Sequence, residues 1–311
     1  MAQDTAKAIT SLRGLTAKFD TAVASIVPYY PEICTVVTST GADEEYARLG
    51  DFPGMREWLG DRIFHQLRAE RHQVRNKTFE SSLGIEKDSI DDDRLGMYGP
   101  LLEQLGTEAG NHPDELVFSI VQQVDSVPGW DGVPLVDDAH EFGESGAQSN
   151  DITFDQVQDL DAITASEFKA SFYAGRLAMA RFKNDQGKYH NRSTMRRLSS
   201  LLCLVPPELQ TVAAESFGSE ILESDSNIVV DRPGVVATPY LENPLEYFLI
   251  NRGGPLRPFL FQRRRPLSRQ MKGLDDREFR DVKFMCDARY AASVSPAWWT
   301  IVRITLEEDN G

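Results

Sequence analysis

The sequence is poor in cysteine, and it lacks the motifs that mark common enzyme sites. Its three cysteines, Cys34, Cys203 and Cys286, are odd in number and far apart, which argues against a disulfide framework or a zinc cluster. We expect them to be buried apolar residues in a reducing compartment. No GxSxG, P-loop or GxGxxG pattern occurs, and the RGGP at residues 252–255 is a turn. The sequence therefore predicts neither catalysis nor a cofactor.

Long apolar runs are absent as well. None reaches the roughly 18 residues that a membrane-spanning helix needs, so we expect no membrane partner. The first residues, MAQDTAKAITSLRG, lack the charged and then apolar plan of a secretory signal. The hydrophobic content of 41% is enough to build a core, and 311 residues allow one large or two modest domains.

Positive charge is scarce, since the formal net charge is −15. As a whole, such a chain should be repelled by nucleic acid and by anionic membranes. A protein that encloses DNA without gripping it would tolerate this balance, whereas a DNA-binding domain would not. The charge is also uneven. Asp and Glu crowd residues 86–93 and 137–161, whereas arginines cluster at 192–197 and 263–265.

Residues 4–27 have the pattern of an amphipathic helix that Pro28 and Pro31 end. Burying its apolar stripe would contribute on the order of 10 kcal/mol before ordering costs. We therefore expect the helix to dock, although the sequence leaves open whether it docks on its own core or on a neighbouring copy. The residues expected to dock are Ile9, Leu12, Leu15, Phe19, Val23 and Ile26.

Residues 62–87 are predicted to form a long hairpin. In its second limb, apolar residues from Phe79 to Ile85 alternate with polar ones, which is the period of a strand with one covered face. The first limb is more polar and rich in arginine. Because a polar ribbon of this length is marginal alone, it needs a surface to lie on.

Residues 88–125 are predicted to form a helix with a break. Three aspartates at 91–93 suit the positive end of the helix dipole. Gly99 and Pro100 should bend the helix, and Asn111–His112–Pro113 should interrupt it before the apolar stripe resumes at Leu116.

The remainder is predicted to mix helices, strands and one acidic loop. Residues 130–150 form that loop, with a strand-like start at 133–136, and residues 227–244 are a candidate small subdomain bounded by Gly and Pro. Helices are expected at 153–183 and from Pro207 to about residue 217, and strands at 198–206, 247–250, 259–262, 279–290 and 298–306.

Two clusters of polar residues could serve as metal or acid–base sites. His112, Asp114 and Glu115 stand at a helix start, where carboxylates have an ordinary structural role. The second cluster has no second histidine at the spacing of a metal site and no glycine-bearing calcium loop, so we interpret it as a solvated acidic loop. Its members are Asp137, Asp138, His140, Glu141 and Glu144.

The basic run FQRRRPLSRQMK at residues 261–272 has two interpretations. Its arginines Arg263, Arg264 and Arg265 could contact DNA phosphates from the inner wall of a container. They could also lie in an interface strand that pairs with acidic neighbours. We favour the interface, because the chain is so short of positive charge elsewhere.

The chain resembles the major head proteins of Mu-like bacteriophages over nearly its whole length. Each matching motif is weak alone, but their order and spacing together are specific. The motifs are EEYARLGDFPGMREWLGDR, RNKTFESSLGIEKDSIDDDRLGMYGPLLEQLG, NHPDELVFSIVQ, WDGVPLVDDAH, LLCLVPPELQTVAAE, PLRPFLFQRRRP and DARYAASVSPAWW.

This resemblance implies an α+β tailed-phage major capsid fold of the Hong-Kong type. Carried onto this chain, residues 1–50 would be the N-terminal arm and 51–87 the extended hairpin loop with its base. Residues 88–205 would be the peripheral domain, with the spine helix at 88–125. An axial domain would follow at 206–246, and residues 247–311 would return to the peripheral domain.

The resemblance also implies a function and its partners. The chain would assemble with copies of itself, as hexamers and pentamers, into an icosahedral shell around double-stranded DNA bound without sequence specificity. A separate scaffold protein, a portal and decoration proteins would be further partners, and the shell would assemble in the bacterial cytoplasm and end in the virion.

We expect inter-subunit contacts from the hairpin and from the basic run. Arg56, Trp58 and Arg62 should fix the base of the extended loop, and the arginine triplet should pair with acidic partners. The full set of expected contact residues is Arg56, Trp58, Arg62, Arg68, Arg71, Arg75, Lys77, Glu80, Arg263, Arg264 and Arg265.

Two rival functions remain open at this point. The first keeps the fold but makes the chain the shell of a bacterial nanocompartment that holds an enzyme. The second is an acidic metal-dependent hydrolase that uses His140 and the carboxylates around it.

Overall fold

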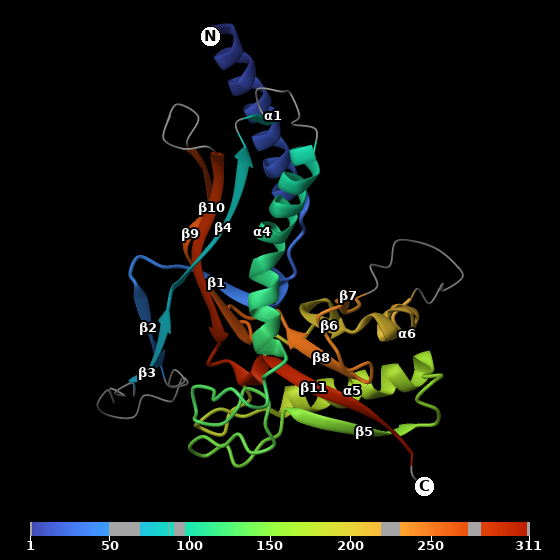
Figure 1. Cartoon of the computed structure of the whole chain (residues 1–311). Helices are drawn as coiled ribbons and strands as arrows, with labels where there is room; N and C mark the ends of the chain where they lie inside the picture. The colour runs from blue at the N-terminus through green and yellow to red at the C-terminus, as the bar shows by residue number, and fades with distance from the viewer. Residues whose placement is uncertain are drawn as a thin grey trace.

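The computed structural model describes residues 2–49, 69–86, 88–89, 97–218, 231–272 and 281–309. Long helices lie over one sheet at one end of the molecule, and a second sheet with its own helices lies at the other (Figure 1). This mixture of helices and separate sheets confirms the predicted α+β class. No helix in the described ranges is long and apolar enough to cross a bilayer.

The first layer consists of a sheet with two long helices packed on it. Its described strands are arranged in the order β1 (Cys34–Thr38), β9 (Phe259–Lys272), β10 (Asp281–Val294) and β4 (Lys77–Glu86). Helix α4 (Tyr98–Val121) lies beside α1 (Ala2–Ser25) over this sheet (Figure 1). The core between them is apolar and consists of Leu15, Phe19, Ile85, Leu102, Val282, Phe284 and Cys286.

The second sheet carries most of the remaining core. Its described strands are arranged as β5 (Asp151–Val157), β11 (Ile301–Glu308), β8 (Glu246–Asn251), β6 (Leu201–Val205) and β7 (Gly234–Ala237). Every residue of β6 is buried, which explains why the sequence predicts this strand so clearly. Helices α5 (Ala165–Arg181) and α6 (Gln210–Ser216) cover it, and α5 approaches so closely that a Cβ on Gly175 would lie 2.4 Å from Ile304 Cδ1.

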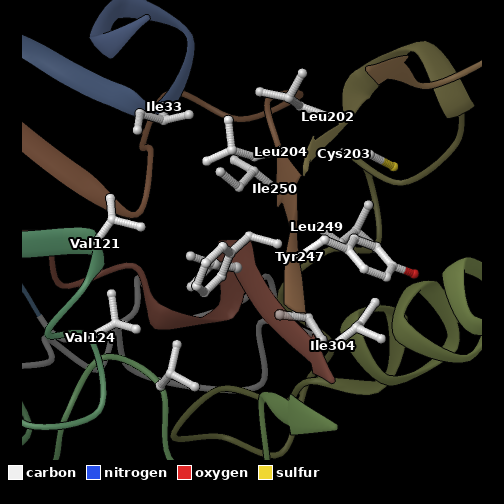
Figure 2. Close-up of a cluster of buried hydrophobic side chains, with 14 of the residues drawn as sticks. Ile33, Val121, Val124, Leu202, Cys203, Leu204, Tyr247, Leu249, Ile250 and Ile304 are labelled. Atoms are coloured by element: carbon white, nitrogen blue, oxygen red, sulfur yellow. The ribbon is translucent and has the colours of Figure 1, made fainter. Parts of the chain in front are cut away.

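One hydrophobic cluster joins the two layers. Val121 at the end of α4 and Val124 just after it face the buried side chains of Leu204, Ile250 and their neighbours on β6 and β8 (Figure 2). Ile33 of the short helix α2 (Tyr30–Ile33) enters the same cluster. The end of the long helix is therefore fixed to the second sheet by shared apolar burial.

The predicted hairpin at 62–87 is wrong in its pairing. Strand β3 (Ala69–Arg75) pairs with β2 (Asp43–Leu49), whereas β4 pairs with β10. The chain passes from β3 to β4 through Asn76, and its backbone N–H donates to Ala42 O at 3.0 Å. A period of two shows that a segment is a strand with one covered face, but it does not show which strand lies beside it.

Helix α4 is continuous, so the predicted break at Asn111–His112–Pro113 is wrong. A proline inside a helix costs about 3 kcal/mol. Leu102 before the proline and Val117 and Phe118 after it are all buried, and this packing outweighs that cost. The aspartates predicted to cap the helix at 91–93 lie outside the described residues.

Other predictions divide between confirmed and wrong. The strand at 247–250 and the helix after Pro207 are confirmed. The strands at 198–206 and 298–306 are confirmed from Leu201 and Ile301 onward, each after one short 3-10 turn. Residues 151–157 form the strand β5 rather than a helix, and residues 133–136 make only an isolated bridge, Pro128 to Pro134. The segment 227–244 is not a separate subdomain, because β7 pairs in parallel with β6.

Helices α1 and α4 approach each other closely at two glycines of α4, Gly106 and Gly110. A Cβ on Gly106 would lie 2.6 Å from Phe19 O, and one on Gly110 would lie 2.9 Å from Ile26 Cγ1. Because the first contact is with backbone, a larger residue there would force the helices apart. Gly14 of α1 has open space around it.

Replacing Gly106 by Ala should lower the free energy of unfolding by about 1–3 kcal/mol, because the added methyl group overpacks the crossing. Gly14→Ala is the matched control and should raise the free energy by roughly 0.5–1 kcal/mol, since it only favours helix. Urea unfolding of the unassembled chain measures both. If both substitutions changed the free energy of unfolding by the same amount, the close approach of the two helices at Gly106 would be contradicted.

Candidate assembly surfaces

Strands β2 and β3 form a two-stranded ribbon that belongs to neither of the two larger sheets. Its strands pair in register from Asp43 with Arg75 to Leu49 with Ala69. Figure 1 shows the ribbon extending away from α4. Its first half packs on the body, where Val74 is buried against Leu260 and Ala291. Because a two-stranded ribbon is marginally stable alone, this packing stabilises it.

A cluster of hydrogen bonds fixes the base of the ribbon. Glu44 Oε1 accepts from Thr40 N at 2.7 Å, Gly41 N at 3.0 Å and Ser39 Oγ at 2.9 Å. Asn76 Nδ2 donates to Ser39 Oγ at 2.8 Å and to Gly41 O at 3.1 Å. The backbone N–H groups of Gly41 and Thr40 hold the pKa of Glu44 below its ordinary value.

Trp130 packs between the ribbon and the body. Its Nε1 donates to Val294 O at 3.0 Å, and its ring stacks on His72 with centroids 4.8 Å apart. Tyr46 of β2 reaches the sheet and donates to Gln262 Oε1 at 2.7 Å. Sequence reasoning noted Trp130 only as the start of the acidic loop. The one feature in the sequence that could have indicated this contact is a large aromatic residue in a turn-rich segment.

Acid should loosen the ribbon base through Glu44. Because its pKa is depressed in the folded state, the stability that it contributes is present above the ordinary glutamate pKa, about 4.5. That stability is lost as the pH falls below this value and through the folded pKa. Hydrogen exchange at Thr40 and Gly41 should accelerate in that window, after correction for intrinsic rates.

The variant Glu44→Gln should show fast exchange at Thr40 and Gly41 at every pH, whereas Glu86→Gln, changed at an exposed position, should behave like the unmodified chain. A Glu44→Gln chain that keeps the acid-dependent step would contradict this role.

The residues of this region that the sequence predicts to contact neighbouring subunits differ in their surroundings. Arg75 is exposed opposite Asp43, and Lys77 is exposed opposite Tyr290 on β10. Glu80 is exposed and accepts from Ser82 Oγ at 2.8 Å. Arg71 lies on β3, but its side chain is outside the described part. Arg56, Trp58, Arg62 and Arg68 all lie outside the described residues.

The consecutive arginines Arg263, Arg264 and Arg265 of β9 are exposed but have different partners. Arg265 forms an ion pair with Asp287 of β10, so its charge is matched within the chain. Arg264 Nη1 donates to Ser39 O at 3.3 Å and supports the ribbon base. Arg263 lies opposite Thr38 on β1 and forms no ion pair with another described residue.

The second half of α1 docks on its own chain. Leu15 and Phe19 are buried, and the Phe19 ring lies 5.0 Å from that of Phe284. Arg269 donates to both carboxylate oxygens of Asp20 at 2.5 Å. Val23 and Ile26 are half-buried, and the side chains of Ile9 and Leu12 lie outside the described part.

The joint after α1 is fixed by Asp114. This buried carboxylate accepts from Tyr29 N at 2.9 Å and from Tyr30 N at 2.7 Å. Burial raises its pKa, and these two hydrogen bonds partly offset the rise. His112 Nδ1 lies 2.5 Å from Tyr290 Oη, so His112 and Asp114 of the predicted polar cluster both have structural partners.

The acidic loop has a structural centre rather than a metal site. His140 is fully buried, stacks on Trp298 with centroids 4.2 Å apart, and pairs through Nδ1 with Asp131 at 2.8 Å. Asp138, Glu141 and Glu144 are exposed. Within the described ranges, no group of three or more His, Cys, Asp or Glu could hold a metal ion.

The cysteines are buried, as predicted, and no disulfide joins them. Burial raises the pKa of the Cys34 and Cys203 thiols, which disfavours the nucleophilic thiolate. Neither residue therefore has the environment of a reactive cysteine.

Comparison with known proteins points to one family. Residues 9–162 match the model of the Mu-like prophage major head subunit gpT family. The chain is similar to the major capsid protein of Escherichia phage Mu, with 38% identity over 36% of each chain. It is also similar to the Mu-like prophage FluMu major head subunit of Haemophilus influenzae, with 34% identity over 47% of each chain.

Both alignments span less than half the length of the curated relatives. A solved structure extends the likeness to the remainder. The procapsid of bacteriophage JBD30 matches over 96% of this chain and 74% of its own, with a TM-score of 0.53 and 23% identity. At this identity the match shows the fold alone, and that fold is a tailed-phage capsid fold.

Proposed function

We propose that this chain, which belongs through residues 9–162 to the Mu-like major head subunit family, forms the icosahedral shell of a phage head around double-stranded DNA. The observation that carries the proposal is the ribbon β2–β3. Its first half is fixed on the body through Glu44, Asn76 and Trp130, and the ribbon extends away from α4. A ribbon with a rigid base that extends in this way suits a surface on a neighbouring copy.

The regions of the shell subunit follow the observed layers. We assign the arm to α1, the extended loop to the ribbon between β2 and β3, and the peripheral domain to α4 with the four-stranded sheet. The axial domain then comprises the sheet of β5, β11, β8, β6 and β7 with α5 and α6. This assignment is wider than residues 206–246, because β6, β7 and β8 share one sheet with β5 and β11.

The mechanism of such a subunit is geometric and needs no chemistry. Two rigid layers joined by a shared core keep their shape, whereas the far end of the ribbon and the first turns of α1, before its docked second half, adjust to the angle between copies. One sequence can then form both hexamers and pentamers. The negative net charge of −15 lets DNA fill the shell without being held tightly.

Further partners follow from this role. A scaffold protein would set the shell size, a portal would replace one pentamer, and decoration proteins would bind the outer surface. Assembly would take place in the cytoplasm of the bacterial host, and the finished shell would be part of the virion.

The capsid fold alone is also compatible with the shell of a nanocompartment. The presence of DNA inside the particles distinguishes the two functions. Particles from infected or induced cells should contain nuclease-protected double-stranded DNA. Particles filled with an enzyme and free of DNA would favour the nanocompartment. The hydrolase alternative would require bound metal, which elemental analysis of the purified chain measures directly.

The first test is to express the chain alone and examine it by sedimentation and electron microscopy. We expect rings or closed shells at high protein concentration. A compact monomer at every concentration, with residues 2–49 fully protected from proteases, would contradict the proposal.

Replacing both Trp58 and Arg62 by Ala should leave a soluble monomer, because these residues are expected to fix the extended loop on its neighbour. The conservative pair Trp58→Phe and Arg62→Lys should retain partial assembly. Sedimentation velocity measures the assembled fraction of each variant. Normal shells from the double alanine variant would refute this role.

A further inference from the structure

We propose that neighbouring copies meet head to tail through two oppositely charged corners of the five-stranded sheet. The inference rests on the proposed ring assembly and names the surfaces that would touch. The acidic corner consists of Asp155, Asp159, Asp161, Glu307 and Glu308. The basic corner consists of Arg192, Arg196, Arg197 and Arg232.

The acidic corner lies where β5 and β11 end. The two strands are parallel, with Leu306 opposite Phe154 and Glu308 opposite Val157. Asp309 N donates to Val157 O at 2.8 Å and holds the two ends together. Residues 151–161 contain no Lys or Arg. All five carboxylates of the corner are exposed, and none forms an ion pair with another described residue.

The basic corner lies where β6 and β7 begin. Residues 188–198 contain basic side chains and no Asp or Glu. Asp231 accepts from Leu198 N at 2.7 Å and from Ser199 N at 2.9 Å, which fixes this turn beside Arg232. The carboxylate of Asp231 is thus committed to backbone groups. The four arginines of the corner are exposed, and none forms an ion pair with another described residue, although Arg197 lies close enough to help lower the pKa of Asp231.

The two corners cannot meet within one chain. Strands β5, β11, β6 and β7 run in the same direction, because β11 and β6 are both antiparallel to β8. The ends of β5 and β11 therefore lie at the opposite end of the sheet from the starts of β6 and β7. At about 4.8 Å per strand, the edge strands β5 and β7 are also roughly 19 Å apart.

A second copy is the partner that satisfies both corners at once. Charge complementarity between different patches gives a head-to-tail contact, which closes into a ring when the rotation allows. Such contacts also set register and exclude wrong partners, since like charges brought together cost several kcal/mol. DNA could match the basic corner but would repel the acidic one, and so would leave it unexplained.

The test reverses each corner separately and then both together. Variant A carries Arg192→Glu, Arg196→Glu and Arg197→Glu, and variant B carries Asp159→Arg, Glu307→Arg and Glu308→Arg. Each should reduce the assembled fraction at least about tenfold at moderate salt, measured by sedimentation velocity. The chain with all six substitutions keeps the net charge of −15 and should assemble again.

Mixing the two separate variants gives a sharper readout. Variant A then has two acidic corners and variant B has two basic ones, so rings can form only with the variants alternating. Electron microscopy of the mixture should show hexamers but no pentamers, because an alternating ring needs an even number of subunits.

The control variant Glu208→Arg with Glu215→Arg changes exposed charges outside the corners and should assemble normally. Three results would overturn the inference: normal assembly of variants A and B, failure of the combined variant to assemble, or shells of variant A that form normally but lose DNA. If the unmodified chain forms no shells, the proposed function fails instead.

Discussion

The backbone of a two-stranded ribbon can satisfy only half of its hydrogen bonds internally, and this constraint governs the molecule. Strands β2 and β3 pair with each other and with no other described strand. Gln262 Nε2 of the body donates to Val74 O at 3.2 Å, and the other groups along the outer edges need water or another chain. The body supplies a rigid base through Glu44, Asn76 and Trp130, and a neighbouring copy supplies the missing surface in the proposed shell.

Close packing also fixes helix α1 and the two layers of the body in place. The glycine crossing at Gly106 and the carboxylate of Asp114 fix α1 and the joint that follows it. The shared core around Val121 and Ile250 fixes the two layers to each other. In the proposed shell, adjustment between copies would then fall on the far end of the ribbon and the first turns of α1, as two ring sizes would require.

The sequence predicts the class of the fold and many of its elements for a clear physical reason. Strands such as β6 and β8 are continuous apolar runs, and buried runs between turn residues are easily recognised. Strand partners were mispredicted, because a period of two identifies a covered face and not a neighbour. The break expected at Pro113 is also absent, since tertiary packing outweighs a local preference.

The candidate surfaces were harder to predict than the fold. Arg264 and Arg265 look equivalent in sequence, yet one supports the ribbon base and the other pairs with Asp287. Trp130 acts on the ribbon from 55 or more residues away in the chain, and no local pattern predicts such a contact. The family resemblance supplied the function, whereas the contacts needed the structure.

Hydrogen exchange of the ribbon before and after assembly tests the central claim most directly. If neighbouring copies cover the ribbon, amides of residues 43–49 and 69–75 should become markedly more protected in the assembled shell. Amides of β6 and β8, already buried, should not change. Equal protection of the ribbon in the monomer and in the shell would contradict the account.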